Sequence, residues 1–148
     1  MKKREERALT SVSVAKEARV PISSTRDVMA ARDAGRVLGT EMGFVPIDLT
    51  MIVTAISELA RNIVQYAGSG EIIIRELRGK GGRGLAIVAK DQGPGIPNLD
   101  LALQEGFSTS GGLGLGLPGV RRLMDTFQIE TQAGHGTTIT AKKWLKIR

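Results

Sequence analysis

The stretch LAIVAKDQGPGI, Leu85–Ile96, decides the fold of this chain. Its first six residues are apolar except for a closing lysine, which predicts a buried strand. Asp91 follows the strand directly, and Gly93 and Gly95 flank a proline in the turn after it. A carboxylate at that strand end can accept a hydrogen bond from an exocyclic amine, and the glycines let a flat ring approach the backbone. An ordinary turn is the alternative, because aspartate, glycine and proline are common turn residues.

Hydrophobic periodicity on both sides of this stretch predicts further strands and helices. The expected order is a strand over 10–20, a helix from Ser24 to about Met42, a helix over 48–67, strands over 71–77 and 85–90, a mobile segment over 98–112, a helix over 115–127, and strands over 129–133 and 137–145. The loop RGKGGRG between the central strands is too long for a tight turn. The order predicts an α/β (α+β) two-layer sandwich, in which helices cover one face of a mixed β-sheet.

The composition limits the protein to a few classes. Its 148 residues predict a single domain, 1–148, with a charged start at 1–8. The chain has no cysteine and one histidine, which excludes a disulfide framework, a thiolate metal site and a multi-histidine metal site. Since no apolar run approaches the roughly 20 residues that cross a membrane, we expect a cytoplasmic protein with no membrane partner.

The formal charge of +6 is concentrated at the two ends of the chain, in KKREER and KKWLKIR, and in RGKGGRG. A basic protein can bind nucleic acid or an acidic partner. Aromatic residues make up only 3% of the chain, too few for the stacking platform of a single-strand binder. We therefore expect solvated ends and no nucleic-acid partner.

Glu58 and Asn62 are four residues apart in the second predicted helix. That spacing places them on one helix face, opposite the stripe of Ile52, Ile56 and Ile63. A carboxylate can take a proton from an attacking hydroxyl, and a carboxamide oxygen can ligate Mg²⁺ without adding charge. A solvated polar face is the alternative interpretation.

The run GGLGLG, 111–116, leads directly into the third predicted helix. Exposed amides at a helix start, helped by the helix dipole, hold phosphate oxygens. Two similar motifs do not apply. The GxGxxG pattern from Gly114 to Gly119 follows no strand, and no acidic residue comes after Glu130, which excludes a dinucleotide fold. The loop RGKGGRG lacks the Gly-Lys-Ser/Thr of a phosphate-binding loop.

The segment GHGTT, 134–138, predicts a tight turn that enters the last strand. Thr137 or Thr138 could bind a base through water. His135 between two glycines is interpreted as an exposed turn residue rather than a catalytic base.

These four segments, in this order, resemble the GHKL superfamily of gyrase-type ATPases, ninety-kilodalton heat-shock chaperones, sensor histidine kinases and anti-sigma kinases. ELARN resembles its N-box, DQGPG and GGLGLG its two glycine boxes, and GHGTT its last motif. The resemblance covers about residue 25 to the C-terminus. It implies the Bergerat ATP-binding fold, with ATP and Mg²⁺ as the bound groups.

Within the superfamily the chain resembles the stand-alone anti-sigma kinases, above all the switch kinases of the stressosome, the RsbT type. That resemblance implies a serine/threonine kinase that uses MgATP to phosphorylate STAS-domain scaffold and antagonist proteins. It also implies that the released kinase binds and activates a PP2C-type phosphatase. A regulatory module that holds nucleotide with little catalysis is the alternative.

The resemblance also assigns site residues. Glu58 would be the general base and Asn62 the Mg²⁺ ligand, while Asp91 would bind the adenine amine and Thr137, or less directly Thr138, would support the ring. The remaining nucleotide contacts fall in the glycine boxes and the lid, at Gly93, Gly95, Ile96, Ser108, Thr109, Ser110, Gly111, Gly112, Leu113, Gly114, Leu115 and Gly116.

One feature departs from the family pattern. Several relatives have a basic lid residue against the terminal phosphate, but no Lys or Arg occurs here between Lys90 and Arg121. The charge on the transferred phosphoryl group must then be met by Mg²⁺, by backbone amides, or by a basic group of the partner. We therefore expect transfer to be slow until the protein substrate completes the site.

Overall fold

The structure is a computed structural model that describes residues 12–96, 103 and 116–146. The charged start at 1–8 and almost all of the segment predicted to be mobile, 98–112, lie outside these residues. None of the helices in the described ranges has the length and apolar character needed to span a membrane.

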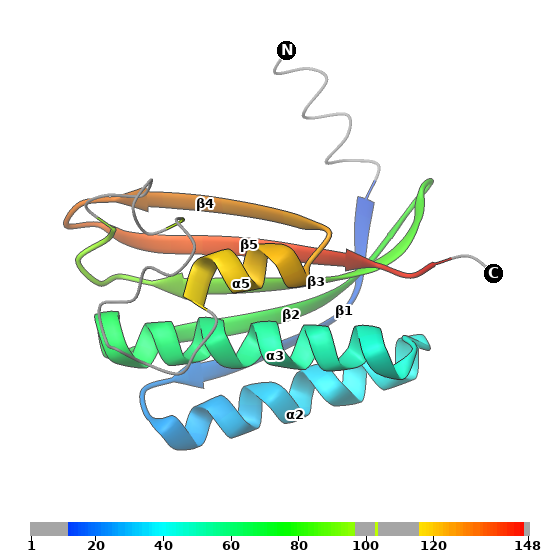
Figure 1. Cartoon of the computed structure of the whole chain (residues 1–148), viewed down its shortest axis with the longest axis horizontal. Coiled ribbons are helices and arrows are strands. Elements are labelled where there is room, and N and C mark those ends of the chain that lie inside the picture. Colours follow the sequence, from blue (N-terminus) through cyan, green and yellow to red (C-terminus); the bar gives the residue numbers. More distant parts are fainter. Residues whose placement is uncertain (1–11, 97–102, 104–115, 147–148) are drawn as a thin grey trace, which may run out of the picture.

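Three α-helices cover one face of a five-stranded sheet, with strand order β1-β2-β3-β5-β4 (Figure 1). The elements in chain order are β1 (Val12–Ile22), α2 (Thr25–Met42), α3 (Pro46–Asn62), the π-helical turn η1 (Ile63–Ala67), β2 (Gly70–Gly79), β3 (Gly82–Asp91), α5 (Gly116–Leu123), β4 (Thr126–Gln132) and β5 (Gly136–Trp144). The predicted two-layer sandwich is confirmed. The expectation of a mixed sheet is wrong, because every strand pair in the described residues is antiparallel.

The paired helices explain why β1 and β2 are antiparallel. β1 ends at Ile22, and α2 runs back along the sheet. α3 then returns to the end of the sheet where β1 stopped, and there Gly70 of β2 pairs with Ile22 (Figure 1). The Asp27 carboxylate starts α2 by accepting the Ser24 N–H at 3.1 Å, a capping arrangement that satisfies a backbone donor at the helix start. The first helix was predicted with nearly these bounds, and the second prediction, 48–67, spans most of α3 and the whole of η1.

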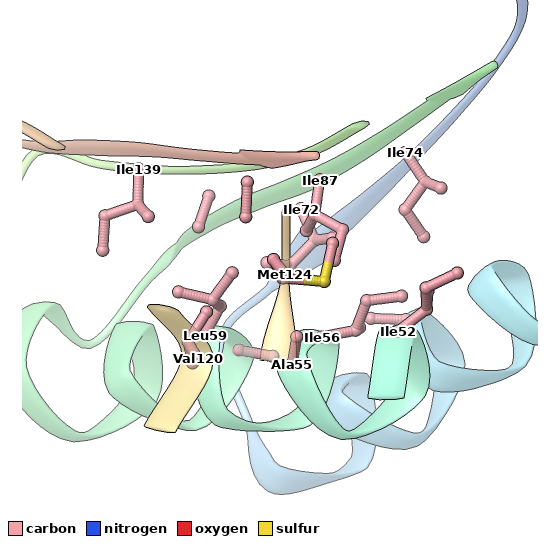
Figure 2. Packing of buried hydrophobic residues seen from close by; sticks show 14 of the residues in the cluster. Ile52, Ala55, Ile56, Leu59, Ile72, Ile74, Ile87, Val120, Met124 and Ile139 are labelled. Atoms are coloured by element: carbon pink, nitrogen blue, oxygen red, sulfur yellow. The ribbon is translucent and has the colours of Figure 1, made fainter. Parts of the chain in front are cut away.

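The core between the two layers is aliphatic. Isoleucines on β2, β3 and β5 meet α3 and α5 across the layer (Figure 2). The residues that form this contact are all 6% exposed or less: Ile52, Ala55, Ile56, Leu59, Ile72, Ile74, Ile87, Val120, Met124 and Ile139. Burying each large aliphatic side chain stabilises the fold by about 1.5–3 kcal/mol, so this layer fixes how the helices lie on the sheet.

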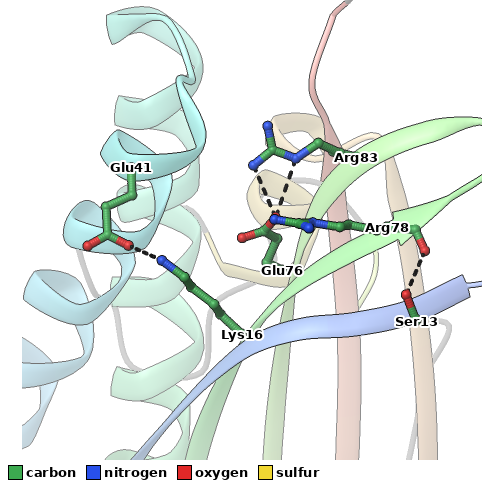
Figure 3. Close-up of polar contacts among 6 residues, drawn as sticks. All are labelled: Ser13, Lys16, Glu41, Glu76, Arg78 and Arg83. Carbon is green, nitrogen blue, oxygen red and sulfur yellow. Dashed lines mark hydrogen bonds and ion pairs between the residues drawn. The ribbon is translucent and has the colours of Figure 1, made fainter.

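The connection within RGKGGRG is shorter than the sequence predicted, so the expectation of a loop too long for a tight turn is wrong. β2 continues to Gly79 and β3 begins at Gly82, so only a tight connection separates the strands. Arg78 and Arg83 are register partners across this hairpin. The Glu76 carboxylate, whose side chain is 3% exposed, accepts hydrogen bonds from Arg78 Nε at 2.8 Å and Arg83 Nη2 at 3.0 Å (Figure 3). The carboxylate thereby offsets the repulsion between the two guanidinium groups, and the pairing of β2 with β3 continues to Gly79 and Gly82.

The helix α5 also ends earlier than the sequence predicted. The predicted helix ran to Phe127, but α5 ends at Leu123 and Phe127 lies in β4. The buried Lys143 Nζ donates to the Leu123 carbonyl at 2.7 Å, and the Asp125 N–H donates to the Lys142 carbonyl at 2.9 Å. These bonds to β5 take up backbone groups that a longer helix would need, so the chain turns into β4.

Replacing Glu76 by Gln is expected to destabilise the fold in a pH-dependent way. Hydrogen bonds from Arg78, the largest cause, and from Arg83 hold the pKa of Glu76 below its usual range, although burial opposes them. The ionised carboxylate therefore stabilises fully above the unfolded-state pKa of about 4.3, and this stabilisation is lost as pH falls through the lower folded-state pKa. Denaturant unfolding should show a loss of about 1–2 kcal/mol at pH 7.

That difference from the wild type should shrink as the pH is lowered below about 4, where the wild-type carboxyl is increasingly protonated. Glu41→Gln is the matched control, because its pair with Lys16 is 3.0 Å long but more than half exposed (Figure 3). The control should change the unfolding free energy by less than about 0.5 kcal/mol. An equal loss in both variants would contradict the role given to Glu76.

Candidate nucleotide and phosphotransfer site

The carboxylate of Asp91 lies at the end of β3, beside the β4–β5 hairpin. Asp91 is the register partner of Thr137 on one side and of Gly70 on the other. Its Oδ1 accepts the Gly93 N–H at 2.9 Å. Within the described ranges that amide is its only hydrogen-bond donor, so the second carboxylate oxygen can still accept a hydrogen bond.

Two glycines let the turn after Asp91 press against the hairpin. Gly95 has a φ of +77°, and a Cβ there would lie 2.5 Å from the Gln132 carbonyl oxygen. Gly136 has a φ of +94°, and a Cβ there would meet the carbonyl of Asp91. Any larger residue would be strained in φ and would collide with backbone at these two positions. The contact therefore fixes Asp91 against β5.

Thr131 joins the same corner, and the sequence analysis did not single it out. Its Oγ1 accepts the Ile96 N–H at 2.9 Å, lies 2.9 Å from Thr137 Oγ1, and donates to the Gly136 carbonyl at 3.3 Å. A signal was available, since Thr131 and Thr137 are equally far from Gly134 and must pair in any hairpin centred there. The hydroxyl thus orients Thr137 and holds the end of the DQGPGI turn.

The two candidate threonines lie on opposite faces of β5. Thr137 is buried on the helix-covered face, which it shares with Ile139 and with Asp91 of β3. Thr138 is the next residue and points to the uncovered face, opposite Lys90. Thr137 therefore joins Asp91, and Thr138 does not. His135 is exposed in the hairpin turn, as expected.

Glu58 and Asn62 lie on the last turns of α3. The Glu58 side chain is only 9% exposed and accepts a hydrogen bond from Arg61 Nη1 at 3.0 Å. Asn62 is half-buried and is the last residue of α3. The alternative of a solvated polar face is wrong for Glu58. A buried carboxylate is costly unless it is paired, and the Arg61 guanidinium supplies the opposite charge here.

The end of α3 and the Asp91 corner are in contact. The π-helical turn η1 follows Asn62 directly, and such turns occur often at functional sites. A Cβ at Gly93 would lie 2.6 Å from Ala67 Cβ in this turn. A Cβ at Gly70 would touch both Ile63 Cγ2, at 3.0 Å, and Asp91 Cβ, at 3.1 Å. Glu58, Asn62 and Asp91 therefore belong to one end of the sandwich.

The start of α5 lies at this same end, where α3 and β3 both terminate (Figure 1). Gly116 is the first residue of α5 and the only residue of the GGLGLG run that the structure describes. The other predicted contacts, Ser108 to Leu115, lie outside the described residues. The structure thus places Glu58, Asn62, Asp91, Thr137 and the first turn of α5 at the same end of the sandwich.

The polar groups at this end suit a magnesium ion that is shared with phosphates. No group of three or more His, Cys, Asp or Glu side chains in the described ranges could hold a metal ion alone. Mg²⁺ usually takes one or two oxygen ligands from the protein and the rest from phosphates and water, so a single carboxamide such as Asn62 fits that pattern.

An open groove of about 360 Å³ lies elsewhere, between β1 and α2, with Ala34, Val37 and Leu38 among its lining residues. None of the predicted site residues lines it. The groove is therefore separate from the corner formed by α3, β3 and β5.

Solved structures share this fold. The chain matches the RsbU and RsbW domains of Rv1364c from Mycobacterium tuberculosis with a TM-score of 0.60 at 19% identity, over 88% of this chain and 32% of that longer chain. It matches the SiaB-SiaC complex from Pseudomonas aeruginosa with a TM-score of 0.54 at 14% identity, over 97% of this chain and 96% of that chain. At such identities these likenesses establish the fold alone.

Sequence comparison goes further. The profile of the histidine kinase-, DNA gyrase B- and HSP90-like ATPases matches residues 47–147. The chain is 54% identical over 127 residues to the serine/threonine-protein kinase RsbT of Bacillus subtilis, covering 86% of this chain and 96% of that protein. It is 32% identical over 100 residues to the anti-sigma F factor of Clostridium kluyveri, covering 65% and 70% of the two chains. The chain therefore belongs to the family of histidine kinase-, DNA gyrase B- and HSP90-like ATPases, on the branch that includes the serine/threonine-protein kinase RsbT.

Proposed function

We propose that this chain uses MgATP to phosphorylate serine or threonine on a STAS-domain partner in the cytoplasm. After release from that partner it would bind and activate a PP2C-type phosphatase, so that phosphorylation switches its partners. The observation that carries the proposal is the buried Glu58 carboxylate, which lies beside Asn62 at the end of the sandwich that also holds Asp91 and Thr137.

Nucleotide binding follows from the corner geometry. The open oxygen of Asp91 would accept the adenine amine, and the Thr137 hydroxyl, oriented by Thr131, would support the ring. The first amides of α5 would face the phosphates, because the helix dipole favours negative charge there. Magnesium held by Asn62 would neutralise phosphate charge.

Phosphoryl transfer would use Glu58 as the general base. The carboxylate accepts the proton of the partner's hydroxyl while the hydroxyl oxygen bonds to the terminal phosphorus. The bond from that phosphorus to the bridging oxygen breaks, and its electron pair leaves on ADP. Positioning and charge stabilisation supply most of the catalysis in such a reaction.

The proposal that the chain acts on protein partners is supported by its similarity to other proteins. RsbT of Bacillus subtilis is a serine/threonine-protein kinase, the Mycobacterium chain joins RsbU and RsbW domains, and SiaB forms a complex with SiaC. The first observation supports a kinase, and the SiaB-SiaC complex is a case in which a chain of this fold binds another protein. The alternative of a nucleotide-holding regulatory module with little catalysis is favoured by one observation, the lack of any basic residue between Lys90 and Arg121.

Glu58→Gln separates the two functions. Loss of the base should slow transfer to a STAS-domain protein by about 10²–10⁴-fold, while ATP binding persists because Gln keeps the shape of the side chain. Transfer is followed with labelled ATP, and the modified residue is mapped. Glu41→Gln, an exposed carboxylate change on α2, is the control. An unchanged rate in Glu58→Gln would remove this residue from catalysis, and absence of transfer by the wild type would favour the regulatory module.

Asp91→Asn should weaken nucleotide binding. A hydrogen bond to a charged group contributes about 1.5–3 kcal/mol, so the Kd for ADP should rise roughly ten- to a hundredfold in calorimetry. Inosine diphosphate is the matched ligand, since its base has a carbonyl where adenine has the amine. The wild type should prefer ADP, and Asp91→Asn should lose most of that preference. Wild-type ADP affinity in the variant would place the adenine elsewhere.

Transfer to a protein should be faster than ATP hydrolysis by the kinase alone. The segment from Asp91 to Val120 contains no Lys or Arg that could reach the terminal phosphate. A docked protein would also position its hydroxyl against Glu58, an advantage that a free water molecule lacks. Single-turnover rates with and without the STAS-domain partner measure the difference. Equal rates would show that the partner adds nothing to the site.

A further inference from the structure

Arg61 lies on the last turn of α3, between Glu58 and Asn62 in the sequence. Its Nη1 donates to Glu58 Oε1 at 3.0 Å, and its side chain is 54% exposed. Three and four residues apart on a helix, these groups occupy neighbouring positions on one face. A carboxylate, a guanidinium and a carboxamide are therefore gathered at the place where phosphoryl transfer is proposed.

Phosphoryl transfer needs positive charge near the terminal phosphate, because negative charge spreads over its oxygens in the transition state. The segment between β3 and the last turn of α5 supplies none, as it contains no Lys or Arg. Lys90 points to the uncovered face of the sheet with Thr138. Arg121 and Arg122 belong to the last turn of α5, away from its first residue, Gly116.

We propose that Arg61 supplies this charge: its guanidinium contacts the terminal phosphate of bound ATP, and in the absence of nucleotide it pairs with Glu58. The inference rests on the proposed function. The base must lie within hydrogen-bond reach of the acceptor hydroxyl, whose oxygen attacks the terminal phosphorus. The Arg61 guanidinium is 3.0 Å from that carboxylate, so it would lie close to the phosphoryl oxygens when ATP and the hydroxyl are bound. Its planar fork carries five donors, so it can bond phosphate and still adjoin Glu58.

An ordinary surface ion pair is the competing explanation, and such pairs contribute little to stability. The chain contains one for comparison: Arg36 pairs with Asp33 at the same spacing, at 3.5 Å, with Asp33 69% exposed. Glu58 differs, because only 9% of its side chain is exposed. Removing Arg61 could therefore also lower stability by leaving a buried carboxylate without its cation. The test must separate that effect from a contact with phosphate.

The test compares Arg61→Met with Arg61→Lys, and uses Arg36→Met as the matched control. Calorimetry gives the Kd for ATP and for ADP, each with Mg²⁺, and single-turnover transfer to a STAS-domain partner gives the rate. Arg61→Met should bind ATP roughly tenfold more weakly, with ADP binding unchanged, since ADP has no terminal γ-phosphate. Its transfer rate should fall by about 10²–10³-fold. Arg61→Lys should recover part of both, and Arg36→Met should resemble the wild type.

Three outcomes would overturn the assignment. Equal weakening of ATP and ADP would mean that Arg61 only supports the fold. An unchanged transfer rate in a folded Arg61→Met would mean that the phosphate does not use it. A faster rate would mean that Arg61 only restrains Glu58. If the wild type transfers phosphate in these cases, the proposed function stands without Arg61. If the wild type transfers none, the proposed function fails, and the ATP-against-ADP comparison still decides where Arg61 binds.

Discussion

The site depends on one close contact between backbones, in which the DQGPGI turn meets the β4–β5 hairpin. At Gly95 and Gly136 the approach leaves no room for a Cβ, and both residues have a positive φ. This contact and the Gly134 N–H bond to the Pro94 carbonyl, 2.8 Å long, hold Asp91 beside Thr137. A carboxylate and a hydroxyl are thereby fixed on the helix-covered face before any ligand arrives, which reduces the ordering cost of binding.

The topology brings the remaining groups to the same end. The helix pair α2–α3 returns the chain to the end where β1 stopped, so Glu58 and Asn62 reach the edge at which β3 later ends (Figure 1). The aliphatic layer under α3 sets the rotation of that helix about its axis (Figure 2). At the C-terminal end of α5, Lys143 Nζ bonds the Leu123 carbonyl, and the Asp125 N–H bonds the Lys142 carbonyl. These bonds anchor the end of the helix to β5.

The sequence predicted what depends on local pattern. The helix periods, the Ser24 start and the apolar strands gave α2, α3, β2 and β3, and the motif order led to Glu58 and Asp91. The errors at the β2–β3 loop and at the end of α5 come from side-chain contacts that no local pattern contains. Glu76 joins two arginines across the β2–β3 hairpin, and Lys143 ends α5 from a strand 20 residues away. Thr131 and Arg61 were missed because their roles depend on neighbours, Ile96 and a buried Glu58, whose positions only the fold defines.

The position of the nucleotide is tested most directly by a crystal structure with Mg²⁺ and a non-hydrolysable ATP analogue. We expect the adenine amine on Asp91 with Thr137 beside the ring, Asn62 on the metal, and the terminal phosphate between the start of α5 and the last turn of α3. A nucleotide bound in the groove between β1 and α2, or with its base away from Asp91, would contradict it.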